Sequence, residues 1–572
     1  MKTEICDCVS EFLKGISFEE VLALMEVPPE ENMGDLALPC HSFARSLHKS
    51  PAVIAQELCE ALLPKAEMLG IERIETVNGY CNFFLDRERY VENCLKQLLQ
   101  EDMGVGKPGI GKTVCMDYSS PNVAKNFHVG HLRTTIIGNS LYKIFEKLGY
   151  HVVRINYLGD WGTQFGKLIT AYRRWSSREA VEEKGIEELL RVYVKFHEEA
   201  DGSSALLEEA RAWFVRMEQN DEEALEYWRW FMDISMVEFE RVYRLLGVSF
   251  DSWSGESVYR EKVSALAASL KEKGLLKESQ GAWVIDLSAY DMPPCLITKS
   301  DGGSIYHSRD MAAAIDRKET YDFDKCLYVT GLEQTLHFKQ VFQALKLMGY
   351  GWADALVHVP YGLVSMDGEK LSSRNGNIVY AEDILREAVG RAHEAIQEKN
   401  PHLPDKDSTA EMVGVGAVIF HDLFHQRIKN VSFSWEEVLS FEGNTGPYVQ
   451  YTYVRAKSIL RKSGESDFTV DKGTQSREIA FDTLTKGSDY MLVKALEGYG
   501  EVVEKAAERY EPSIVAKYVV SVAAAFNRFY HECPILQVKN PKRTARFLLT
   551  KLTAQILCEG CDLLGMKCPE EM

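Results

Sequence analysis

The stretch from residue 113 to 158 constrains the fold most strongly. It begins with a short β-branched and apolar run, residues 113–118, that is typical of a buried strand. A polar loop follows, and then apolar residues recur at helical spacing: Leu132, Ile136, Ile137, Leu141, Ile144, Phe145 and Leu148. Gly149 stands where a helix C′ residue belongs, and residues 151–158 are a second strand candidate. The pattern predicts a βαβ unit, which crosses over right-handed into a parallel sheet.

The polar loop before that helix, residues 119–131, carries two histidines. We expect it at the carboxyl end of the first strand, where the free N–H groups and the dipole of the helix N-terminus favour phosphates. His128 and His131 are three residues apart, so both rings can face one ligand, and Gly130 lets that ligand approach the backbone. Solvent exposure or a core contact would also explain two histidines at this spacing.

The length of 572 residues is too great for one compact core and predicts about three domains. Hydrophobic residues make up 45% and charged residues 26%, as in ordinary globular proteins. No apolar run reaches the ~18 residues of a membrane span, and the N-terminus lacks a signal-peptide pattern, so we expect a cytoplasmic protein without a membrane partner. Thirteen scattered cysteines indicate reduced thiols, and we expect no metal at the lone Cys558–Cys561 pair.

The net charge of −19 is unusual for a protein that binds nucleic acid. The acidity is local, because residues 176–230 hold 15 acidic and 7 basic side chains, whereas residues 446–572 hold 16 acidic and 18 basic ones. RNA can bind a local patch whatever the total charge. Composition therefore neither supports nor excludes an RNA partner.

A second polar loop follows the second strand of the βαβ unit. Residues 156–167 contain three glycines together with Asn156, Asp160, Trp161 and Gln164. A tight turn explains the glycines but not this set of polar side chains, which would point toward the ligand edge of the sheet.

The middle of the chain continues the sheet after an insertion. Residues 168–275 have a helical pattern without proline and predict a helical insertion. A hairpin is expected next, and residues 326–331 and 356–364 are further strand candidates. Tyr306 and Asp310, four apart at the start of a predicted helix, can present a hydroxyl and a carboxylate to one pocket.

The two ends of the chain differ in pattern. Residues 1–110 predict a small α/β domain, with a helix that starts near Pro51 and a strand at residues 76–85, and a Gly-rich connector, residues 104–112, closes it. Beyond residue 415 the pattern is helical. Basic and aromatic side chains there could form an RNA-binding surface, although a solvated helix face explains the charges equally well.

Three of these segments resemble the motifs of class I aminoacyl-tRNA synthetases. His-Val-Gly-His at residues 128–131 resembles the first class I signature. Ser-Pro-Asn-Val-Ala-Lys at residues 120–125 and the run at 156–167 have the forms found in arginyl-tRNA synthetases.

The polar loop at residues 365–377 resembles the second class I signature, through the run from Lys370 to Arg374. This chain departs from that signature because Ser373 replaces its second lysine. In the arginyl family this loss commonly accompanies a lysine just before the first signature, and Lys125 occupies that place. The two departures thus explain each other.

The resemblance extends from about residue 18 to 572 and implies an α/β protein of three domains. Residues 1–110 would contact the tRNA elbow. Residues 111–445 would form a Rossmann-like catalytic domain with a parallel sheet and a helical insertion at about 175–275, without a separate editing domain. Residues 446–572 would form an all-α anticodon-binding domain.

The implied function is that of an arginine–tRNA ligase, which activates arginine with ATP and transfers it to tRNA(Arg). The implied catalytic residues are Lys125, His128, His131 and Lys370. The ATP-binding residues are His128, Gly130, His131, Lys370, Ser372 and Ser373. The arginine-binding residues are Ser120, Asn122, His131, Asn156, Tyr306, Asp310 and Gln334. The tRNA-binding residues are Arg455, Lys457 and Arg461.

Asp310 is the expected guanidinium partner, because a guanidinium has only donors and needs an anionic acceptor. Mg²⁺ is expected with ATP as the substrate complex, without a tightly bound protein metal. We expect a monomer that does not bind DNA. Alternatives are another class I synthetase, such as the glutaminyl, glutamyl or cysteinyl enzyme, a small nucleotidyltransferase of the same superfamily, and an RNA-binding paralogue.

Overall fold

The computed structural model describes residues 1–28, 30–123, 125, 127–200, 202–298, 305–366, 369–370, 380–462 and 479–572. Contacts divide the chain into two compact units. The first comprises Met1–Gly104, Ile459–Glu497 and Ala525–Leu552, and the second comprises Val105–Ser458, Gly498–Ala524 and Thr553–Met572. This division concerns packing, so the three functional domains at 1–110, 111–445 and 446–572 stay a prediction.

The first unit contains a three-stranded antiparallel sheet of order β1-β3-β2. Its strands are β1 (Leu36–Pro39), β2 (Ile71–Val77) and β3 (Tyr80–Leu85). Its helices include α1 (Lys2–Phe12), α2 (Phe18–Leu24), α3 (Ala44–Leu47), α4 (Pro51–Leu62), α5 (Arg87–Leu98) and α19 (Gly487–Leu496). The start of α4 is as predicted, with Pro51 in the first turn and the Ser50 hydroxyl accepting a hydrogen bond from the Val53 N–H.

The single strand predicted at residues 76–85 was wrong. Asn78 and Gly79 both have positive φ and form a two-residue turn between β2 and β3. Such turns favour Asn-Gly because their twist matches that of the paired strands. The run is therefore the tip of a hairpin.

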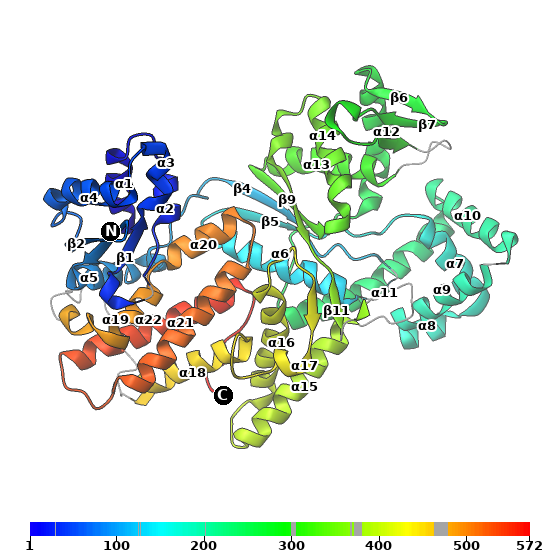
Figure 1. Ribbon diagram of the computed structural model, residues 1–572. Coiled ribbons are helices and arrows are strands. Elements are labelled where there is room, and N and C mark those ends of the chain that lie inside the picture. Colours follow the sequence, from blue (N-terminus) through cyan, green and yellow to red (C-terminus); the bar gives the residue numbers. More distant parts are fainter. Residues whose placement is uncertain are drawn as a thin grey trace. The chain divides into compact units, whose positions relative to one another are not determined.

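The second unit is built on a four-stranded parallel sheet of order β10-β9-β4-β5. The strands are β4 (Thr113–Asp117), β5 (His151–Ile155), β9 (Lys325–Gly331) and β10 (Leu356–Tyr361). The predicted βαβ unit is confirmed, because α6 (Val129–Lys147) joins β4 to β5 and Gly149 adopts positive φ after its end. Figure 1 shows α6 on one face of this sheet and α13 (Tyr306–Tyr321) and α14 (Thr335–Leu347) on the other.

Helix α6 is buried along most of its length. Gly138 makes one close approach possible, because a Cβ there would lie 2.2 Å from the ring of Tyr118, which follows β4. On the opposite face, Cys115 and Val153 of the strands pack with Met311 of α13 and Val341 of α14. The sheet is thus covered on both sides, as in doubly wound α/β folds.

The predicted helical insertion is confirmed over the described residues. It consists of α7 (Thr163–Trp175), α8 (Arg178–Lys184), α9 (Ile186–Ala200), α10 (Ser204–Glu218), α11 (Glu222–Leu246) and α12 (Glu256–Glu272). The expected hairpin follows as an antiparallel sheet of β6 (Leu276–Ser279), β7 (Ala282–Ile285) and β8 (Cys295–Thr298).

The predicted strand at 356–364 ends early and is followed by a separate small sheet of order β12-β11-β13. Its strands are β11 (Val364–Met366), β12 (Glu369–Lys370) and β13 (Val431–Phe433). The remaining helices are α15 (Ala381–Lys399), α16 (Lys406–Phe424), α17 (Trp435–Val438), α18 (Gly446–Lys462), α20 (Tyr499–Glu508), α21 (Ser513–Glu532) and α22 (Lys542–Leu563). Among the described residues, no helix is long and apolar enough to cross a membrane.

Candidate active site

The parallel sheet has a topological switch point between β4 and β9. From β4 the chain passes through α6 to β5 on one side, whereas β9 lies on the other side of β4 and leads on to β10. In open α/β sheets, ligands bind at the carboxyl ends of the strands beside such a point, because the connections diverge there and leave a crevice. The loop after β4 and the N-terminus of α6 lie at this edge.

The two predicted histidines are brought together at the start of α6. The His128 Nδ1 accepts a hydrogen bond from the Gly130 N–H at 3.0 Å, and the His128 N–H points to the His131 Nδ1 at 3.4 Å. The rings stack with their centroids 3.8 Å apart. Because both Nδ1 atoms accept, each neutral ring carries its proton on Nε2 and keeps a donor for a ligand oxygen.

Both histidines favour the neutral form. Burial lowers the pKa of His128, and the charge of Lys125 lowers it further. Burial lowers the pKa of His131 well below its usual value, with His128 and Lys125 adding to the effect. The Lys125 side chain is exposed to solvent, yet partial desolvation lowers the pKa of its ammonium, and so does Lys167. Neutral imidazoles can donate hydrogen bonds, and the effect of Lys125 on both pKa values indicates that it lies close to them.

The loop between β4 and α6 has an unusual backbone. Ser119 and Ser120 both have positive φ, 72° and 47°. Non-glycine residues adopt this conformation at a cost and keep it where neighbouring groups impose it. The Ser120 N–H donates to the Asn156 Oδ1 at 3.1 Å, and the Ser120 hydroxyl donates to Asp117 at 2.8 Å. Asn156 is fully buried and also donates to the Tyr243 hydroxyl at 2.9 Å, so this side chain fixes the loop.

The 156–167 loop is anchored to its surroundings through backbone and carboxylate bonds. Gly159 pairs with Asn122, and a Cβ at Gly159 would lie 2.3 Å from the Asn122 Oδ1. The buried Asp160 accepts hydrogen bonds from the Ser257 N–H at 2.8 Å and the Ser257 hydroxyl at 2.6 Å. The Asn122 side chain itself is exposed.

A layer of buried charges lies beneath the edge of the sheet. Arg317 of α13 is 2% exposed, and its guanidinium lies 2.7 Å from the Asp117 carboxylate at the end of β4. The rings of Tyr157 and Tyr328 lie 5.3 Å from the same guanidinium. Burial raises the pKa of the Asp117 carboxyl; Arg317 and the hydrogen bond from Ser120 oppose that rise, whereas Asp310 adds to it. Asp310 is therefore close to Asp117.

Asp310 differs from the other carboxylates of this layer in its partner. Arg309 forms an ion pair with Glu256, whereas the Asp310 Oδ2 lies 2.5 Å from the His337 Nε2 of α14. Burial raises the pKa of Glu256 to about 7, and Arg309 opposes this shift while Asp310 adds to it. A histidine is not a permanent cation, so a cationic ligand could form an ion pair with the Asp310 carboxylate.

The other predicted residues lie at several places. Tyr306 is 64% exposed at the start of α13. Gln334 is exposed in the short turn after β9. The backbone of Lys370 pairs with Ser365 of β11, and Ser372 and Ser373 lie outside the described residues.

The three candidate tRNA-binding residues lie on α18. The guanidinium of Arg455 lies 4.8 Å from the Tyr451 ring, and Lys457 pairs with Glu570 at 3.8 Å. Arg461 lies in the last turn of that helix.

Sequence reasoning missed Tyr243, Arg317 and His337. Arg317 follows Asp310 by seven residues on one helix, so the two share a helix face, and this spacing could have indicated it. Nothing local indicates Tyr243 or His337, because tertiary packing brings each of them to its partner.

Comparisons with known proteins identify the family of this chain. The family model described as "tRNA synthetases class I (R), catalytic domain" matches residues 94–435. The models of the arginyl tRNA synthetase N terminal domain and the DALR anticodon binding domain match residues 2–85 and 449–572. The fold is thus that of a class I aminoacyl-tRNA synthetase.

Individual relatives and solved structures show which family of class I synthetases this chain belongs to. Arginine–tRNA ligases of Clostridium beijerinckii and Clostridioides difficile are 48% and 46% identical to this chain over its whole length, with 100% and 99% of their own lengths covered. The Thermus thermophilus arginyl-tRNA synthetase structure matches with a TM-score of 0.83 at 26% identity, and each chain is fully covered. The chain belongs to the arginyl-tRNA synthetase family.

Proposed function

We propose that this chain carries out its arginine–tRNA ligase reaction at the carboxyl edge of the parallel sheet. One observation carries the assignment of the site. The stacked His128–His131 pair caps α6 at the switch point, and Asp310 lies near the adjoining end of β4. A phosphate-binding helix end thus stands beside an anionic group suited to a guanidinium.

The first step is the activation of arginine. A carboxylate oxygen of arginine attacks the α-phosphorus of ATP, the bond to the β,γ-phosphates breaks, and arginyl-adenylate and pyrophosphate form. No protein nucleophile is needed, so the protein positions the reactants and stabilises the charge that develops on the phosphate oxygens. The Nε2–H groups of His128 and His131 and the N-terminus of α6 donate to these oxygens. Lys125 and Lys370 supply positive charge, with Gly130, Ser372 and Ser373 also at the nucleotide.

Arginine is selected by its guanidinium. The Asp310 carboxylate accepts hydrogen bonds from the guanidinium, and Tyr306 lies beside Asp310 in the proposed pocket. His337 holds the Asp310 carboxylate through the contact of 2.5 Å between its Nε2 and the Asp310 Oδ2. Lysine is rejected because a single ammonium cannot form the bidentate pair. The proposed arginine-binding set is completed by Ser120, Asn122, His131, Asn156 and Gln334. Asn156 acts through the backbone of Ser120, since its side chain is fully buried.

The second step uses tRNA. A hydroxyl of the terminal ribose attacks the acyl carbonyl of the adenylate, and AMP leaves. Arg455, Lys457 and Arg461 of α18 are proposed to contact tRNA(Arg), and residues 1–110 its elbow. Across the described residues, no group of three or more His, Cys, Asp or Glu side chains is arranged to hold a metal ion. Mg²⁺ is proposed to enter with the triphosphate, and the protein is proposed to be cytoplasmic and monomeric.

The test is arginine-dependent exchange of pyrophosphate into ATP, with and without tRNA(Arg), and with lysine, glutamine and glutamate in place of arginine. Exchange with arginine, and with none of the other three amino acids, supports arginine as the substrate. If exchange also requires tRNA(Arg), adenylate formation depends on tRNA. Exchange with another of these amino acids, or with none, would contradict the proposal.

A variant tests the residue assignment. Asp310→Asn should raise the arginine KM about 10²-fold, because the partly buried anion that would pair with the guanidinium is lost, and should leave the ATP KM nearly unchanged. Asp322→Asn is the matched control, since Asp322 lies at the end of the same helix with positive φ that Asn also tolerates. An unchanged arginine KM in Asp310→Asn would remove Asp310 from the pocket.

A further inference from the structure

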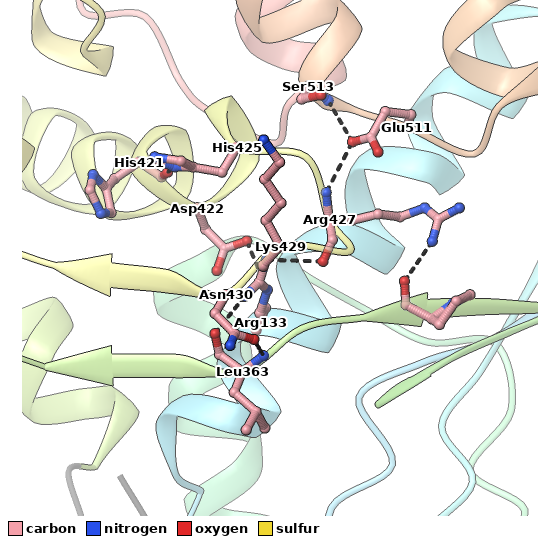
Figure 2. Close-up of polar contacts among 11 residues, drawn as sticks. Arg133, Leu363, His421, Asp422, His425, Arg427, Lys429, Asn430, Glu511 and Ser513 are labelled. Carbon is pink, nitrogen blue, oxygen red and sulfur yellow. Dashed lines mark hydrogen bonds and ion pairs between the residues drawn. The ribbon is translucent and has the colours of Figure 1, made fainter. Parts of the chain in front are cut away.

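Helix α6 carries a buried arginine that the proposed reaction does not use. Arg133 lies two residues after His131 and is 1% exposed. Its guanidinium donates to the Leu363 carbonyl at 3.0 Å, the Arg427 carbonyl at 3.1 Å and the Lys429 carbonyl at 3.0 Å. Figure 2 shows this guanidinium among the three carbonyl groups and Asp422. One side chain of α6 therefore binds two separate stretches of backbone.

These two stretches are also bonded to each other. The Gly362 N–H donates to the Arg427 carbonyl at 2.9 Å, and the Leu363 N–H donates to the Asn430 Oδ1 at 2.8 Å. A Cβ at Gly362 would lie 2.6 Å from the Lys429 carbonyl oxygen, so only glycine permits this approach. The two backbones then continue as β11 and β13, which pair in parallel.

Few residues separate the backbone that Arg133 holds from Lys370, which belongs to the segment that resembles the second class I signature. Leu363 immediately precedes β11, and Ser365 of β11 pairs with Lys370 of β12. His131 lies two residues before Arg133 on α6. A change in how Leu363 is held would therefore change the position of Lys370 relative to the histidine pair.

A second arginine extends the same network. The Arg427 Nε donates to the Tyr510 carbonyl at 2.8 Å, and its Nη1 donates to the Pro360 carbonyl at 2.5 Å. The Arg427 N–H donates to the Glu511 Oε1 at 3.2 Å. Burial lowers the pKa of Arg427, and Glu511 opposes that shift. The loop at 427–430 is thus held both to β10 and to the turn between α20 and α21.

The chemistry of these contacts requires arginine. Arg133 must reach carbonyl groups on two segments at once, which its planar fork of donors allows and the single ammonium of lysine does not. The nearby Asp422 balances the charge, with 3.5 Å between its Oδ1 and the Arg133 Nε. Burial raises the pKa of the Asp422 carboxyl, and Arg133 opposes this rise.

We propose that Arg133, with Arg427 behind it, is a positioning residue that fixes the spacing between the histidine pair of α6 and Lys370 of β12. The inference rests on the roles proposed above for His128, His131 and Lys370. It predicts that loosening this contact impairs the ATP-dependent step without altering the pocket for the amino acid, because Asp310 and His337 lie on α13 and α14.

The test is Arg133→Lys in the full chain, assayed by arginine-dependent pyrophosphate exchange. We expect kcat/KM for ATP to fall about 10²-fold, because a shift near 1 Å at the reacting groups has an effect of this size. The arginine KM should stay within about twofold of the unaltered protein, whereas a general loss of structure would change both. Arg391→Lys is the control, because Arg391 is half-exposed on α15 and pairs with Glu387.

A milder variant covers the case in which Arg133→Lys does not fold. Asn430→Ala removes the hydrogen bond to the Leu363 N–H, and Asn430 is exposed. It should lower kcat/KM for ATP several-fold and leave the arginine KM unchanged. The positioning role would be overturned if a folded Arg133→Lys had the same kcat/KM for ATP as the control Arg391→Lys. It would also be overturned if Asn430→Ala had the same kcat/KM for ATP as that control. If the unaltered protein shows no arginine-dependent exchange, the proposed function fails instead.

Discussion

Gly130 offers a way to disturb the histidine pair without unfolding the protein. A Cβ at Gly130 would lie 3.0 Å from the His128 Nδ1 and 2.9 Å from its Cε1, and real Cβ atoms essentially never come as close as the second distance. In Gly130→Ala the imidazole of His128 must therefore turn away. It then loses the hydrogen bond from the Gly130 N–H and its stacking on His131.

The effects on stability nearly cancel. Loss of the side-chain cap at the start of α6 costs about 1 kcal/mol. Alanine in place of glycine within a helix gains about 0.5–1 kcal/mol, and the backbone of Gly130 is helical, so it accepts alanine. The free energy of unfolding should therefore change by less than about 1 kcal/mol.

The effect on activity should be large. If the His128 imidazole binds phosphate as proposed, its displacement by about 1 Å should lower the rate about 10²-fold, equivalent to about 2.7 kcal/mol in the activation free energy. The measurement is kcat/KM for ATP in pyrophosphate exchange at saturating arginine, together with urea unfolding of the same samples.

Gly390→Ala is the matched control. Gly390 lies within α15, and a Cβ there would meet nothing within 4 Å, so this variant should gain stability and keep full activity. If Gly130→Ala also keeps its activity within threefold, the position of the His128 ring does not matter to the reaction, and the proposed role of the histidine pair is refuted.

Two other histidines give independent predictions. His337→Ala should raise the arginine KM about tenfold, because Asp310 loses its hydrogen bond from His337. His337→Gln keeps a donor, so its arginine KM should lie close to that of the unaltered protein. Equal arginine KM values in the two variants would contradict this role of His337. Burial lowers the pKa of His358 to about 4 from 6.5, so the unfolded chain binds a proton that the folded chain does not, and stability should fall as the pH drops from about 6.5 to about 4. In His358→Gln the urea midpoint should fall less between about pH 7 and about pH 5, and an identical pH dependence would exclude His358 as its source.

The elements of the catalytic fold followed from local pattern. Leu132, Ile136 and Leu148 recur at helical spacing and Gly149 ends the helix, so β4, α6 and β5 could be predicted, as could the helical insertion. Asn78–Gly79 has the chemistry of a hairpin turn, although the alternation across residues 76–85 favours a single strand. The histidine pair could be predicted because both rings belong to one helix end.

The partners of the site residues could not be predicted in the same way. Arg317 meets Asp117 across 200 positions of sequence, and His337 meets Asp310 only because α13 and α14 pack on one face of the sheet. Such pairs follow from the strand order, which sequence periodicity does not encode. Asn156 shows the consequence, since the sequence presents it as a polar group for a ligand, and packing makes it a fully buried support for Ser120.

The pKa shifts of the histidines bear on the altered second motif. Because burial keeps His128 and His131 neutral, they can donate hydrogen bonds to phosphates but cannot neutralise them. The site therefore needs cations from elsewhere, and Ser373 removes one that the second class I signature normally supplies. Lys125 contributes to lowering the pKa of both histidines, which requires its ammonium to lie near them. We therefore expect Lys125 to supply, in the proposed nucleotide site, the positive charge that the second motif lacks at Ser373.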